Sequence, residues 1–136
     1  MLKLKKINPN ILTGKPKEVY NYAKVISILA DYGYECCLLT NDWEGADFLA
    51  NHKDHTLRIQ MKSCTAFAKK YMDKDLHVIF PWDNGIWLYN HDKFLEEFPN
   101  ILESKSWEKH ETFSYTKTSK PLLEKLESSK HAIFID

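Results

Sequence analysis

Apolar and polar residues alternate along two neighbouring segments near the middle of the chain, which is typical of a β-hairpin. In residues 46–50, Ala46, Phe48 and Ala50 face one way and Asp47 faces the other. In residues 57–62, apolar residues again alternate with polar ones. A turn at Lys53 and Asp54 would join the two strands. The pattern therefore predicts a hairpin with one apolar and one polar face.

The register of this hairpin predicts a polar cluster. A tip between Lys53 and Asp54 places Asp47 opposite Gln60. Directly opposed residues share a face, with Cβ atoms about 5 Å apart. We therefore expect Asp47, Gln60 and Lys62 to lie together, backed by the apolar face.

A helix is predicted before the hairpin. Apolar residues recur at helical spacing between Pro16, which suits a first helical turn, and Gly33, which suits a helix end. Glu18 is expected in the first turn, where the helix dipole favours a carboxylate. Residues 34–39 are then predicted as a strand and residues 40–42 as a turn.

Strands and short helices follow the hairpin. Residues 76–80 predict a buried strand that ends at Pro81, and residues 86–89 predict the next strand after a turn. The later predictions are a short helix capped by Asp92 and stopped by Pro99, a helix opened by Pro121 and a strand over residues 132–135, with residues 103–118 unassigned. The chain is thus expected to be one α/β domain over residues 1–136, with a mixed central sheet flanked by helices.

Composition narrows the class of protein. Of the 136 residues, 43% are hydrophobic and 28% are charged, as in soluble globular proteins. No run approaches the roughly 20 apolar residues of a membrane span, and no apolar stretch follows the N-terminal lysines as in a signal peptide. We therefore expect a cytoplasmic protein without a membrane partner.

The three cysteines, Cys36, Cys37 and Cys64, are too few and too irregularly spaced for a disulfide framework. Free thiols are the simplest interpretation, and a zinc site is a weaker alternative because metal-ligand spacing is absent. A Cys64–His nucleophilic pair is a further alternative to a small buried thiol.

Charge is balanced overall but not locally. Basic and acidic residues number 19 each, which argues against coating nucleic acid by charge alone. A basic arm, residues 1–15, carries with Lys17 five lysines and no acid. The lysines selected as candidate nucleic-acid contacts are Lys15, Lys17, Lys69, Lys70 and Lys74. They are interpreted either as solvated surface or as contacts to a phosphate backbone.

The polar cluster has the chemistry for phosphodiester hydrolysis. This reaction uses a divalent cation to neutralise the phosphate and to lower the pKa of a water. Asp47 offers a carboxylate, Gln60 a side-chain carbonyl and Met61 a main-chain carbonyl, all ligands that Mg²⁺ accepts. Lys62 would orient the water or stabilise developing charge. Glu18 would join them if its helix packs across the sheet.

Asp47, the segment Gln60-Met61-Lys62 and the upstream Glu18 resemble the PD-(D/E)XK nuclease superfamily over roughly residues 14–90. The resemblance implies a restriction-endonuclease-like αβββ core, with Asp47 as metal ligand, Lys62 as catalytic lysine and Glu18 as the helix glutamate. Gln60 stands at the family's Asp/Glu position, as in some Holliday-junction-resolvase-like and intron-encoded nucleases. A second departure is Ala46, where the family has proline.

The resemblance implies a Mg²⁺- or Mn²⁺-dependent endonuclease that cuts DNA, and cleavage of both strands favours a homodimer. The alternative is a catalytically degenerate module of the same fold that binds nucleic acid or a protein partner. The simplest alternative is a half-exposed hairpin whose outer face happens to carry polar residues.

Overall fold

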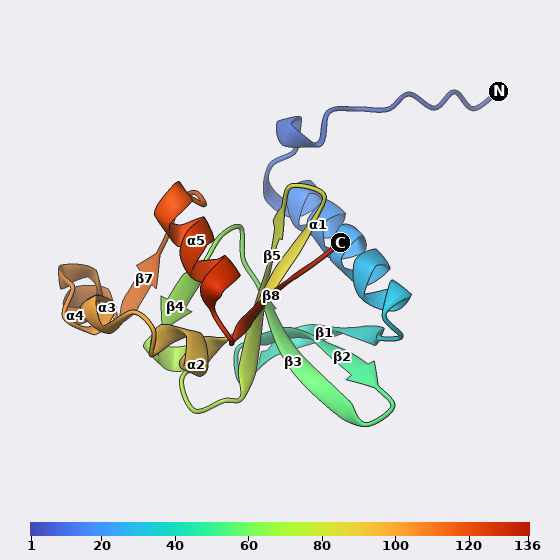
Figure 1. Cartoon of the computed structure of the whole chain (residues 1–136). Helices are drawn as coiled ribbons and strands as arrows, with labels where there is room; N and C mark the ends of the chain where they lie inside the picture. The colour runs from blue at the N-terminus through green and yellow to red at the C-terminus, as the bar shows by residue number, and fades with distance from the viewer.

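A computed structural model describes residues 1–136 of the chain. Its centre is a six-stranded sheet with the strand order β1-β2-β3-β5-β6-β8 (Figure 1). The strands are β1 (Glu35–Trp43), β2 (Ala46–His52), β3 (His55–Met61), β5 (Leu76–Trp82), β6 (Gly85–Asn90) and β8 (Ala132–Ile135). Only β3 and β5 are parallel, so the sheet is mixed, as predicted.

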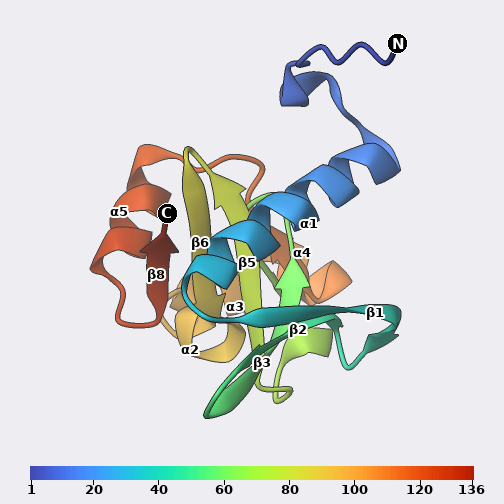
Figure 2. The same cartoon turned by 90° about the vertical axis from the view of Figure 1, so that its right-hand side faces the viewer.

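One face of the sheet is covered by the long helix α1 (Gly14–Asp31), which crosses it in Figure 2. The helix forms because apolar residues recur every three or four positions and Gly33, at φ +86°, ends it. Between helix and sheet lies a core of Val25, Leu29, Phe48, Ala50, Ile59, Ile79 and Ile86. The N-terminal segment, with the short 3₁₀ helix η1 (Pro9–Ile11), extends away from this body (Figure 1).

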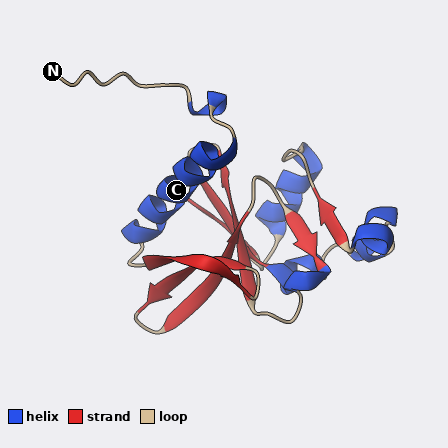
Figure 3. Cartoon of the chain, turned by 180° about the vertical axis from the view of Figure 1, so that it is seen from behind, coloured by secondary structure: helices blue, strands red, loops and turns tan.

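The other face is covered by smaller elements, seen from behind in Figure 3. They are β4 (Ala66–Ala68), η2 (Lys69–Tyr71), α2 (His91–Leu95), α3 (Pro99–Leu102), α4 (Lys105–His110), β7 (Thr112–Ser114) and α5 (Lys120–Ser128). Strands β4 and β7 pair as a separate two-stranded sheet. Eleven buried residues, among them Phe67, Phe80, Tyr89 and Phe94, form the core on this side. None of the helices combines the length and the apolar character that a membrane crossing requires.

Two buried side chains, one on β6 and one at the start of α2, hold β4 in place. The Tyr89 hydroxyl accepts a hydrogen bond from Ala66 N–H at 3.0 Å and donates one to Ala66 O at 2.9 Å. Nε2 of His91 accepts from Ala68 N–H at 3.1 Å. This bond requires an unprotonated Nε2, and burial accordingly lowers the pKa of His91. The backbone of β4 is therefore satisfied by side chains where the main sheet offers no strand.

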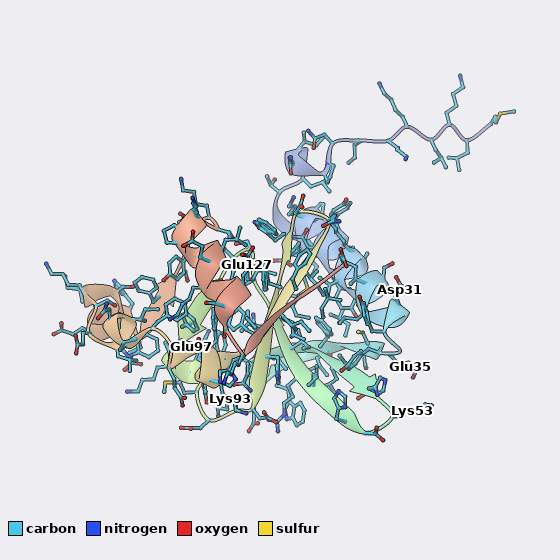
Figure 4. All side chains as sticks on the ribbon, viewed as in Figure 1. Asp31, Glu35, Lys53, Lys93, Glu97 and Glu127 are labelled. Carbon is cyan, nitrogen blue, oxygen red and sulfur yellow. The ribbon has the colours of Figure 1, made fainter.

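The predicted hairpin is confirmed. Strands β2 and β3 pair antiparallel from His52 opposite His55 at the tip to Phe48 opposite Ile59. Lys53, at this tip, is labelled at the end of the hairpin in Figure 4. The predicted strand over residues 132–135 is also confirmed as β8.

Two strand boundaries were predicted wrongly. Strand β1 continues through residues 40–42, which were expected to turn, and its pairing with β2 is irregular between Leu38 and Trp43. Pro81 does not end β5 but pairs with Ile86 on β6. The proline is tolerated because β3 no longer pairs with β5 at this point, so no backbone partner requires its missing N–H.

Helix starts account for the other errors. α1 begins at Gly14, so Glu18 lies beyond the first turn. Asn90, not Asp92, caps α2 through a bond from Lys93 N–H. Pro99 begins α3 rather than stopping a helix, because proline suits the first helical position.

Removing the Tyr89 hydroxyl should destabilise the fold. In Tyr89→Phe, the N–H and the C=O of Ala66 both lose a buried partner, so we expect the free energy of unfolding to fall by about 2–3 kcal/mol. Denaturant unfolding measures the change. Tyr20→Phe, on the exposed side of α1, is the matched control and should change stability by less than about 0.5 kcal/mol. Equal stability of the two variants would contradict the role given to Tyr89.

Candidate active site

The site is built where β2 and β3 separate. The ladder between these strands ends at Phe48 opposite Ile59, whereas the ladder between β3 and β5 continues to Met61 opposite Ile79. Lys62 N–H then donates to Ile79 O at 2.9 Å. Because successive peptide groups of a strand point to opposite sides, the N–H and C=O of Met61 point away from β5, toward the gap beside β2.

The side chain of Asp47 fills part of this gap. Its Oδ2 accepts a hydrogen bond from Met61 N–H at 2.9 Å, so a carboxylate takes the place of a backbone carbonyl. The residue is half-buried. Burial raises the pKa of Asp47 above its ordinary value, although the Met61 hydrogen bond and the charge of Lys62 act in the opposite direction.

The side chain of Gln60 lies next to the main-chain carbonyl group of Met61. Its Nε2 donates to Met61 O at 3.3 Å. Thus the carboxylate of Asp47 and the amide of Gln60 engage the two main-chain groups of Met61, beyond the last paired residues of β2 and β3. The side chains of Asp47 and Gln60 therefore meet at Met61.

Lys62 extends from the end of β3 over an aromatic ring. Its Nζ lies 5.4 Å from the centroid of the Tyr71 ring. The side chain is partly buried and forms no ion pair at 4.0 Å or less. Its positive charge still lowers the pKa of Asp47, which places the two groups within electrostatic reach of each other.

Two further carboxylates act on Asp47 through their charge. The negative charges of Asp42 and Glu18 both raise the pKa of Asp47. Glu18 is exposed on α1 and lies 3.6 Å from Lys15 Nζ. Asp42 was assigned to a turn from sequence and was missed as a site residue. Its Oδ2 accepts from Gly45 N–H at 3.3 Å, and only the extension of β1 past the predicted turn would have revealed it.

The lysines selected from the sequence occupy different environments. Lys69 pairs with Glu111 at 3.4 Å, and Lys17 Nζ donates to Pro9 O at 3.2 Å. The Lys70 Nζ lies 5.2 Å from the Tyr71 ring centroid. The main-chain carbonyl of Lys74 accepts a hydrogen bond from Arg58, which also forms an ion pair with Glu44.

The donor set is one of hard oxygens. Carboxylate, amide and main-chain oxygens suit Mg²⁺ or Mn²⁺, whereas zinc prefers sulfur and nitrogen. No group of three or more His, Cys, Asp or Glu side chains is placed to hold a metal ion. Any ion at Met61 would therefore depend on the neutral oxygens of Gln60 and Met61 as well as on Asp47.

The cysteines offer no second site. All three are free thiols, as predicted. Cys64 is buried, and its Sγ lies 3.5 Å from the Thr118 hydroxyl. A small buried thiol is thus the interpretation that this environment favours.

Comparison with protein-family models and with curated proteins gives no match for this chain. The functional conclusion therefore depends on the geometry and chemistry of the site.

Asp47→Asn should stabilise the folded protein at neutral pH. A carboxyl with a raised pKa in the folded state favours folding below its ordinary pKa, and this contribution is lost as pH rises through the raised value. Removing the charge should therefore raise the unfolding free energy at pH 7, and the gain should vanish in acid. Denaturant unfolding across pH measures the difference. Asp54→Asn at the exposed hairpin tip is the control, and a similar change in both variants would contradict this account.

Proposed function

We propose that the protein is a metal-dependent endonuclease that hydrolyses phosphodiester bonds in DNA. The observation that carries the proposal is the gap at Met61. There a half-buried carboxylate of Asp47, the amide of Gln60 and a main-chain carbonyl meet next to Lys62. Oxygen ligands beside a cationic side chain are what phosphodiester hydrolysis requires.

The order of elements supports a restriction-endonuclease-like core. Helix α1 is followed by β1, β2 and β3, and the chain then crosses over to the parallel strand β5. This agrees with the αβββ order that the resemblance to PD-(D/E)XK nucleases implies. The crossover here contains β4 and η2.

The residues present fit a small divalent cation. Asp47, Gln60 and Met61 O would hold it, with Glu18 and Asp42 near enough to add negative charge. Nε2 of Gln60 occupies a position 3.3 Å from Met61 O, near enough for ligand atoms at the two positions to hold one small cation. Turning the amide would bring its oxygen to that position. When bound, the ion would neutralise phosphate charge and acidify a water.

The chain's own residues have separate tasks. Asp47 must be ionised to act, and Lys62 favours that form through its charge. The ammonium of Lys62 would stabilise negative charge that develops on the phosphate. Glu18, which is exposed on α1, would orient a water molecule at the site.

Binding of DNA would use lysines around the site. Lys70 and Lys74 lie on the segment that follows β4, and Lys15 and Lys17 lie at the start of α1. Lys15 would first have to release Glu18, whereas Lys69 is already paired with Glu111 and is not among these contacts. A homodimer would cut both strands.

A second candidate is a nuclease-fold module without catalysis. It is favoured by the hydrogen bonds that Asp47 and Gln60 already make to Met61, which satisfy the gap without an ion. The neutral Gln60 also contributes no charge to attract a cation. Such a module would bind nucleic acid or a protein partner.

Cleavage assays separate the two candidates. Plasmid, linear and four-way-junction DNA are incubated with Mg²⁺ or Mn²⁺ and with wild-type protein, Asp47→Ala or Lys62→Ala. We expect cutting by the wild type and a loss of about 100-fold or more in each variant, with DNA binding largely kept in Lys62→Ala.

Asp54→Ala and Lys53→Ala, both at the hairpin tip, are the matched controls and should cut like the wild type. Undiminished cutting by Asp47→Ala would contradict the proposed site. No cutting with any metal or substrate would instead favour the non-catalytic module.

A further inference from the structure

The ring of Tyr71 is seated against the start of β2, beside the proposed site. Tyr71 is 5% exposed. Gly45, two residues before Asp47, has φ +88°, and a Cβ atom there would lie 2.8 Å from Tyr71 Cδ1. Only glycine therefore allows the ring to approach this closely.

The position of Tyr71 is also fixed by the segment that precedes it. It ends η2, which directly follows β4, and β4 is held by the hydrogen bonds of Tyr89 and His91. The ring of His91 meets the Tyr71 ring edge-on, with centroids 5.7 Å apart. The Tyr71 ring is thus packed between the Gly45 backbone and the His91 ring.

Two ammonium groups share this one ring. Lys62 Nζ lies 5.4 Å and Lys70 Nζ 5.2 Å from its centroid, although the two lysines come from different segments. Neither forms an ion pair with a carboxylate, whereas the adjacent Lys69 pairs with Glu111. An aromatic ring attracts cations, so the single Tyr71 ring brings both ammonium groups to the same part of the protein.

We propose that Lys62, Tyr71 and Lys70 form a clamp for a phosphate group. The two ammonium groups bind its oxygens, and Tyr71 is the positioning residue that sets their placement. A phosphate mono- or diester offers more than one charged oxygen, so each unpaired ammonium group could bind one of them. That this phosphate belongs to a DNA strand rests on the proposed function, but the clamp itself needs neither a metal nor cleavage.

The test measures phosphate binding without metal. Inorganic phosphate is titrated into the protein in the presence of EDTA, and the NMR signals of the Tyr71 ring and of the lysine side chains are followed. We expect saturable shifts, with affinity lowered about tenfold in Lys70→Met and in Lys62→Met. Lys69→Met removes a neighbouring charge that is already paired and should bind like the wild type.

Variants of the ring separate positioning from charge. Tyr71→Phe keeps the aromatic face and should retain affinity, whereas Tyr71→Leu should lose it. Should Tyr71→Leu fail to fold, the comparison of Lys70→Met with Lys69→Met decides. Equal affinity in those two variants, or the absence of saturable binding in the wild type, would overturn the clamp.

A metal-free titration with a short DNA duplex tests whether the bound phosphate belongs to a DNA strand or is free inorganic phosphate. Weaker duplex binding in Lys70→Met than in Lys69→Met would support a DNA strand as the ligand. Binding of inorganic phosphate with no such difference for DNA would overturn that assignment. Because no cleavage is measured, an inactive protein with an intact clamp contradicts only the proposed nuclease activity.

Discussion

The site depends on the end of strand β3, which is still paired with β5 on one side but no longer paired with β2 on the other. Parallel pairing with β5 extends to Met61, while antiparallel pairing with β2 stops at Ile59. The N–H and C=O of Met61 are thereby left facing a gap, and buried peptide groups need partners. Side chains of Asp47 and Gln60 supply them. A break in a ladder of hydrogen bonds has become a place where polar side chains converge.

Structural support for this gap comes from the elements that cover the face of the sheet opposite α1. Tyr89 and His91 bind the backbone of β4, and β4 leads directly into the turn that carries Tyr71. Tyr71 in turn rests on Gly45 and underlies Lys62. The buried core that stabilises the fold therefore also determines where the ammonium group of Lys62 lies relative to Asp47. The cost of the arrangement appears in Asp47 itself, since burial disfavours its charged form.

Local patterns predicted the elements better than their ends. The alternation in residues 46–62 was enough to predict the register in which Phe48 lies opposite Ile59, because one buried face fixes the register of a hairpin. The reach of β1 to Trp43 and the place of Pro81 inside β5 depend on which neighbouring strand is missing, and that is a tertiary property. For the same reason Asp42 was missed. The contact of Lys62 with Tyr71 joins two segments whose proximity no local spacing reveals.

The central claim is that the gap at Met61 receives a divalent cation, and Mn²⁺ tests it directly because this paramagnetic ion broadens NMR signals only near its binding site. Mn²⁺ is added in small amounts to the wild type and to Asp47→Asn, and backbone amide signals are compared. The account predicts that the amide signals of Met61 and Asp47 broaden first in the wild type and persist in the variant. Uniform broadening, or broadening first at the hairpin tip around Asp54, would contradict it.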